Sequence, residues 1–98
     1  AEDVLDAAEY IHEAGYTICD GLVHGFGGGM MPPDLRTRRT SATPPQPFMF
    51  AENMTLVIQP NIVTLGERAG LQVGELVRVT PSGVESLHRY PMRFVHCG

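Results

Sequence analysis

Apolar residues recur at helical spacing in the first fifteen positions, AEDVLDAAEYIHEAG, at Val4, Leu5, Ala8 and Ile11. This spacing predicts an amphipathic helix. Two acidic residues, Glu2 and Asp3, fall in its first turn, where they favour the positive end of the helix dipole. Gly15 follows the last apolar position, and glycine is the usual residue just past a helix end. We therefore expect one N-terminal helix that ends near Gly15.

After Gly15 the pattern changes to that of strands. The segment YTICDGLVHGF predicts a strand, or an extended pair that is broken at Asp20-Gly21. MTLVIQPNIVTL is the most apolar stretch and predicts a buried strand that ends at Pro60, because proline cannot donate to a ladder. GLQVGELVRVTPSGVESL predicts strands around a turn at PSG. The expected fold is α+β, a single domain over residues 1–98 with one helix followed by antiparallel strands.

Between Pro32 and Pro47 the pattern is interrupted. This segment holds five of the eight prolines together with TSAT, and it predicts a long irregular loop over residues 32–47. Loops of this length in compact domains are often functional. The only basic cluster of the chain, Arg36, Arg38 and Arg39, falls here, and we interpret it as part of a solvated loop.

Charge and composition restrict the possible functions. The net charge is −4, and all seven basic residues are arginine, which excludes a P-loop lysine or a Schiff base within the chain. The acidic balance argues against nucleic-acid and anionic-membrane partners, which require clustered positive charge. Cys19 and Cys97 match no metal-ligand spacing, so we expect free thiols in a reducing cytoplasm. No apolar run reaches the length of a membrane span.

The stretch VHGFGGGMMPP, which begins at Val23, raises the question of a binding loop. A dinucleotide loop requires G-x-G-x-x-G at the start of a helix, but from Gly25 the sixth position is Met30, and two prolines follow. His24 is the more informative residue, because a neutral imidazole can bind a divalent ion or act as a base. Glycines beside it, Gly25 and Gly27, would allow a close approach of backbone and substrate.

In order, the segments VHGFG, NMTLVIQP and QVGELVRVTPSG resemble the C-terminal half of the pita-bread hydrolases, the family of aminopeptidase P, prolidase, methionine aminopeptidase and creatinase. The motifs of that family in the same order are G-H-G-x-G, G-M-x-x-x-x-E-P and R-x-E-D-x-x-x-V-T-x-x-G. The resemblance covers nearly the whole chain. It implies a helix followed by a curved antiparallel sheet, which is half of a pita-bread fold.

The resemblance also implies a site. Family peptidases hold two divalent ions, such as Mn, Co or Zn, with two aspartates, one histidine and two glutamates. His24 takes the place of the histidine ligand. Gln59 stands at the first glutamate place and Gly74 at the second, with Glu75 where the family has aspartate. A second family histidine, which contacts substrate, aligns with Met31. The two aspartates belong to strands upstream of the region matched here.

This ligand set is incomplete, since too few carboxylates remain to neutralise two dications. The first hypothesis is a hydrolase-like domain that acts on an amide or C–N bond of a small molecule or peptide. In it His24 and Gln59 are catalytic, Gly25, Gly27 and Glu75 contact the substrate, and His24 is the only family metal ligand retained. A homo-oligomer or a missing N-terminal half would complete the cleft. The alternatives are a non-catalytic binding module that keeps the cleft, and an unrelated α+β protein in which His24 is structural.

Overall fold

The computed structural model describes residues 1–98, and it opens with the expected helix, α1 (Glu2–Glu13). Leu5 and Ala8 are buried, Val4 and Ile11 are half-buried, and both acidic residues of the first turn are in place. Gly15 has a φ of +87°, the left-handed conformation that ends a helix without strain in glycine. The helix predicted from apolar spacing is confirmed.

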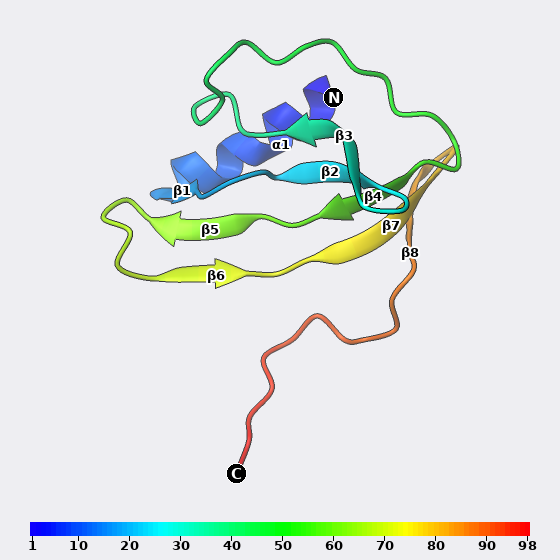
Figure 1. Ribbon diagram of the computed structural model, residues 1–98. Helices are drawn as coiled ribbons and strands as arrows, with labels where there is room; N and C mark the ends of the chain where they lie inside the picture. Colours follow the sequence, from blue (N-terminus) through cyan, green and yellow to red (C-terminus); the bar gives the residue numbers. More distant parts are fainter.

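Eight strands follow the helix and form two antiparallel sheets (Figure 1). The first sheet has the order β1 (Tyr16–Ile18), β5 (Asn61–Thr64) and β6 (Gly70–Gln72). The second has the order β3 (Met30–Leu35), β2 (Val23–Phe26), β4 (Thr55–Ile58), β7 (Glu75–Thr80) and β8 (Gly83–Ser86). The α+β class is therefore confirmed, whereas the single curved sheet is replaced by two sheets.

Three lengths of chain each supply one strand to both sheets. Residues 16–26 supply β1 and β2, residues 55–64 supply β4 and β5, and residues 70–80 supply β6 and β7, so each length crosses both sheets (Figure 1). Every length is interrupted where a regular ladder is difficult to continue. Asp20 has a φ of 66°, Pro60 has no N–H, and Gly74 carries no side chain. We call this seam between the sheets the bend.

Backbone hydrogen bonds carry the pairing of strands across the bend. The amide of Gln59 donates to the carbonyl of Leu22 at 2.9 Å, and the amide of Cys19 donates to the carbonyl of Asn61 at 2.9 Å. Residues 16–26 and 55–64 thus stay side by side through the interruption. Because the two segments remain paired, the polar side chains at their interruptions are held close together at the bend.

The Pro-rich segment begins later than expected. Residues 30–35 form β3, an edge strand paired with β2, so the irregular part starts only after Leu35. Two prolines are tolerated in β3 because an edge strand does not need every N–H for its ladder. Pro33 is buried. The interpretation of Pro32 and Pro33 as loop residues is wrong for this reason.

The core is small and lies where α1 packs against β1 and against one face of the five-stranded sheet. Eleven of the 98 residues are buried. The hydrophobic cluster comprises Ala8, Ile18, Leu22, Val23, Leu35, Leu56 and Val77. Since buried strand residues alternate with half-buried ones, the other face of the sheet is left to polar and intermediate side chains.

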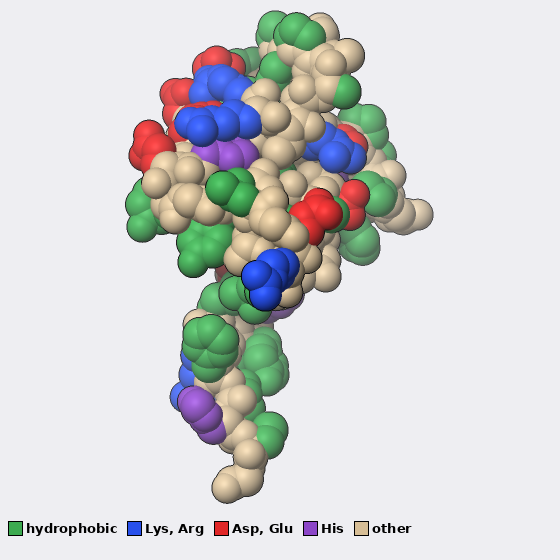
Figure 2. Space-filling view, turned by 90° about the vertical axis from the view of Figure 1, so that its left-hand side faces the viewer, with side chains coloured by type: hydrophobic (Ala, Val, Ile, Leu, Met, Phe, Trp, Pro, Cys, Tyr) green, Lys and Arg blue, Asp and Glu red, His purple; other side chains and the backbone are tan.

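The basic cluster lies in an exposed loop, as expected, and two of its three arginines are also tied to the helix. Arg38 contacts Glu2 and Asp6, both at 2.7 Å, and Arg39 contacts Glu9 at 2.8 Å. Figure 2 shows basic side chains directly against acidic ones on this part of the surface. The sequence does not reveal this pairing, because the partners are some thirty residues apart along the chain.

Candidate functional site at the bend

His24 lies on β2 with its side chain directed away from α1. Its neighbours Val23 and Gly25 are buried, and β2 alternates between its two faces, so His24 belongs to the opposite face. It stands opposite Val57 of β4 and Asp34 of β3. Because residues directly opposite in an antiparallel pair share a face, the carboxylate of Asp34 and the imidazole of His24 are on the same side of the sheet.

The imidazole of His24 has one nitrogen engaged and one free. Nδ1 lies 2.9 Å from the carbonyl oxygen of Gly25, and only a protonated Nδ1 can donate to a carbonyl. In the neutral ring this leaves the lone pair on Nε2, for which no protein partner is present. Nε2 can therefore accept a proton or a hydrogen bond from a bound molecule.

Gln59 reaches the same face from the end of β4. It follows Val57 by two positions, and Val57 is paired with His24. Its side chain runs over Gly74: a Cβ added at Gly74 would lie 3.3 Å from Cγ of Gln59 and 3.5 Å from its Nε2. The two positions that the resemblance assigns to glutamate ligands are thus neighbours in space.

These residues surround an open polar hollow of about 420 Å³ at the bend. Only one lining residue, Met30, is hydrophobic. The lining residues are Asp20, Gly21, His24, Met30, Asp34, Arg36, Gln59, Asn61 and Gln72. They come from β2, from β3 and its continuation, from the interruptions at residues 20–21 and 59, and from the adjoining ends of β5 and β6. The hollow thus gathers an imidazole, three amides, two carboxylates and a guanidinium.

Asn61 contributes an unsatisfied group to this hollow. Its Oδ1 is buried and has no hydrogen-bond partner, although such atoms are nearly always paired in folded proteins. An N–H or O–H donor at the bend would satisfy this oxygen. Sequence reasoning did not single out Asn61, Gln72, Asp20 or Asp34, because they belong to no motif and come together only through the pairing of distant segments.

Gly25 and Gly27 are explained by the approach of β3. A Cβ on Gly25 would lie 2.3 Å from the carbonyl oxygen of Pro32, and one on Gly27 would lie 3.2 Å from Sδ of Met31. Neither glycine lines the hollow. The structure therefore gives both glycines a role in strand packing rather than bringing them into contact with the site.

Glu75 and Met31 are also placed apart from His24. Glu75 stands opposite Ile58, and both lie on the face that carries Val23 and is covered by α1. No bulge brings the Glu75 carboxylate round to the hollow. Met31 pairs with Gly25 on the edge strand and is half exposed, so its thioether is not a lining group either.

The residues present do not fit a pair of divalent ions. No three His, Cys, Asp or Glu side chains come together in an arrangement that would hold a metal ion. Gln59 and Gly74 supply no negative charge, and hard dications prefer carboxylate oxygens. We therefore derive no chemical step through a metal held by this chain alone.

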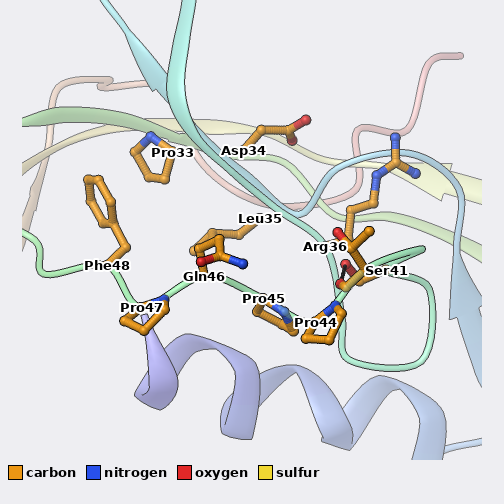
Figure 3. Close-up of a pocket in the computed structure, with 11 residues that line it drawn as sticks. Pro33, Asp34, Leu35, Arg36, Ser41, Pro44, Pro45, Gln46, Pro47 and Phe48 are labelled. Carbon is orange, nitrogen blue, oxygen red and sulfur yellow. Dashed lines mark hydrogen bonds between the residues drawn. The ribbon is translucent and has the colours of Figure 1, made fainter.

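A second hollow, of about 240 Å³, lies beneath the Pro-rich segment (Figure 3). Pro44, Pro45 and Pro47 lie in a row that faces β3. Its only charged lining residues, Asp34 and Arg36, also line the hollow at the bend. With this proline-rich lining it offers few groups for chemistry, and the bend remains the candidate site.

Two further findings bear on the expectations from sequence. Cys19 and Cys97 are free and exposed, as expected. The 12-residue α1 is the only helix, and no helix has the length and apolar character needed to cross a bilayer.

Comparisons with protein-family models, with curated proteins and with solved structures gave no match for this chain.

Proposed function

We propose that this chain forms the C-terminal half of a pita-bread domain and that the hollow at the bend is its substrate cleft. The proposal rests on the resemblance of three ordered motifs. One spatial observation supports it most: residues at the histidine place and the first glutamate place line one hollow, and the second glutamate place adjoins Gln59. Motifs matched by chance would have no reason to converge in this way.

The activity that this hollow supports best is that of a metal-independent, hydrolase-like domain. Its substrate is a small polar molecule with an amide or C–N bond. Nε2 of His24 is free to take a proton from a nucleophile or return it to a leaving group. Gln59, Asn61 and Gln72 are suited to hold polar groups of the substrate by hydrogen bonds. A second copy or an N-terminal half supplies the remaining wall of the open cleft.

The second candidate is a binding module that keeps the cleft without catalysis. Gln59 and Gly74 favour it, because both glutamate places have lost their carboxylates while the two residues still pack together. The Met31 substitution points in the same direction. Both candidates bind the same class of small polar molecule, and they differ only in whether the bound molecule is hydrolysed.

The choice between hydrolase and binding module is tested by measuring whether the chain turns over small amides, Xaa-Pro dipeptides or ureas. For the hydrolase, His24→Ala lowers kcat by roughly 100-fold or more, the usual contribution of a positioned acid–base group. The matched control is His96→Ala, which removes an exposed histidine that does not line the hollow. Binding without turnover would select the binding module, and equal activity of both variants would contradict the assignment of His24.

A further inference from the structure

The last twelve residues, 87–98, form an arm that carries exposed apolar side chains. The arm follows β8 and contains no helix or strand. Its first residues are held to β7, where the Leu87 amide donates to the Leu76 carbonyl at 2.9 Å, and residues 90–94 line a shallow hollow with residues 71–74. Beyond this point the chain end points away from the body of the molecule (Figure 1). Tyr90, Met92 and Phe94 are 75%, 61% and 84% exposed. Figure 2 shows the arm as a narrow projection with apolar and basic side chains. Such a concentration of exposed apolar groups indicates an interaction surface.

The arm has a specific pattern of chemistry. Tyr90, Met92 and Phe94 alternate with other residues along the sequence, and Arg89 and Arg93 lie next to them in the chain. The backbone bends at residues 90, 92 and 93, where the Arg93 amide donates to the Pro91 carbonyl at 3.0 Å. The arm contains no acidic residue, and neither arginine forms an ion pair. Its complement is therefore an apolar groove with acidic residues at its margin.

A groove of this kind lies between α1 and the strands beneath it. It measures about 380 Å³, and seven of its nine lining residues are hydrophobic. Val4, Ala7 and Ile11 line it from α1, while Val23 and Ile58 line it from the sheet. Asp3, which forms no ion pair, is part of the lining.

A second free carboxylate stands beside this groove. Glu75 pairs with the groove residue Ile58 and shares its face of the sheet, and it has no ion-pair partner. Two carboxylates without an ion-pair partner thus accompany the groove, as two arginines without an ion-pair partner accompany the apolar residues of the arm.

The arm of a given copy points away from its own groove. In Figure 1, α1 and the C-terminus lie at opposite ends of the molecule. A second copy can bring its arm to the groove without any refolding of the body. We propose that two copies exchange arms, so that Tyr90, Met92 and Phe94 of each copy occupy the α1 groove of the other and its arginines meet Asp3 and Glu75.

The arrangement is reciprocal, as expected of a twofold dimer, and it covers two apolar surfaces in each copy. It also enlarges a core that has only eleven buried residues in one chain. A chain of this size gains much from such a partner, since small domains bury a low fraction of their surface.

Cysteine trapping between two different chains tests this placement. Both chains carry Cys19→Ser and Cys97→Ser; one also carries Ala7→Cys, at an exposed groove position, and the other Phe94→Cys. We expect a mixed disulfide under mild oxidation, because a disulfide requires Cα atoms within about 7 Å. The control replaces Ala7→Cys by Tyr10→Cys, an exposed helix position outside the groove. A yield no higher than that of the control would overturn the proposal.

Charge reversal gives an independent readout by sedimentation equilibrium. Reversal of both arm arginines, Arg89→Asp with Arg93→Asp, is expected to raise the dimer dissociation constant roughly tenfold or more. Adding Asp3→Arg and Glu75→Arg to that variant is expected to recover most of the loss. These side chains are outside the core, and circular dichroism checks the fold. A monomeric unmodified chain, or no recovery in the combined variant, would refute arm exchange.

Discussion

At the scale of single residues, the structure separates residues that pack from residues that are available to a ligand. Gly25 lies next to His24 in sequence, yet it is buried against β3 while His24 faces the open hollow. The glycine-rich stretch is therefore needed for a close approach of two backbones. The imidazole beside it keeps Nε2 free, and this difference decides which substitutions affect stability and which affect binding.

Gly25→Ala tests the packing role. The added Cβ would meet the Pro32 carbonyl at 2.3 Å, so β3 must move, and we expect a loss of about 2 kcal/mol or more in the free energy of unfolding. Gly66→Ala is the control, because its Cβ would meet nothing closer than 3.7 Å. Urea denaturation measures both. Similar losses in the two variants would show that the strand approach is not tight.

A gain of metal binding tests the family resemblance. Gln59→Glu combined with Gly74→Glu places one carboxylate in the hollow that His24 lines and a second next to it, and the long side chain at position 59 can shift to make room. We expect calorimetric affinity for Mn, Co or Zn to rise at least about tenfold over the unmodified chain, and this gain to vanish when His24→Ala is added. Gln59→Glu with Gly66→Glu is the control of equal charge. An equal gain in that control would contradict the assigned places.

At the scale of elements, the periodicity of apolar residues predicted the helix and strands that bury one face. The spacing in α1 and the alternation in β7 identify a buried face, and both elements are found. β3 was missed because its two prolines indicate a loop, while its edge position in the sheet, which makes them tolerable, is a long-range property. The convergence of Asp34, Asn61 and Gln72 with His24 was missed for the same reason: strand pairing creates it.

The contact between α1 and residues 37–40 is another feature that only the structure reveals. Thr37 is fully buried; its hydroxyl lies 2.7 Å from Nε2 of His12 and 3.0 Å from Oγ1 of Thr40. Arg38 donates to Glu2 and Asp6, and these hydrogen bonds raise the pKa of its guanidinium, with Glu2 as the larger cause. Because the pKa of Arg38 is higher in the folded state, these contacts stabilise the fold at every pH below the pKa of Arg38 in the unfolded chain. This stabilisation is lost only in strongly alkaline solution, as the pH rises through the pKa of Arg38 in the folded state.

Thr37→Val tests this contact. It keeps the shape of the side chain but leaves the His12 nitrogen without its partner, so we expect a loss of about 1–2 kcal/mol in the free energy of unfolding. Thr43→Val, at an exposed position of the same segment, is the control and is expected to change stability by less than about 0.5 kcal/mol. Equal stability of the two variants would mean that the buried hydroxyl contributes nothing.

At the scale of the whole molecule, three long lengths of chain cross two sheets and bend together. Polar residues from the interruptions and from the adjoining strand ends meet at the bend, and they line a hollow that is open on the face away from α1. The other face has an apolar groove beside the helix, and the arm leaves the body at the far end. The proposed substrate site thus lies on one face, and the surface of the proposed arm exchange lies on the other.

The central claim is that the hollow at the bend is a binding site organised around His24. The most direct measurement is chemical-shift mapping by NMR with a panel of small amides, amines and carboxylates, on the chain and on His24→Ala. We predict that perturbations cluster on His24, Gln59, Asn61 and Gln72 and disappear in the variant. Perturbations that cluster elsewhere, or persist unchanged without the imidazole, would contradict the account.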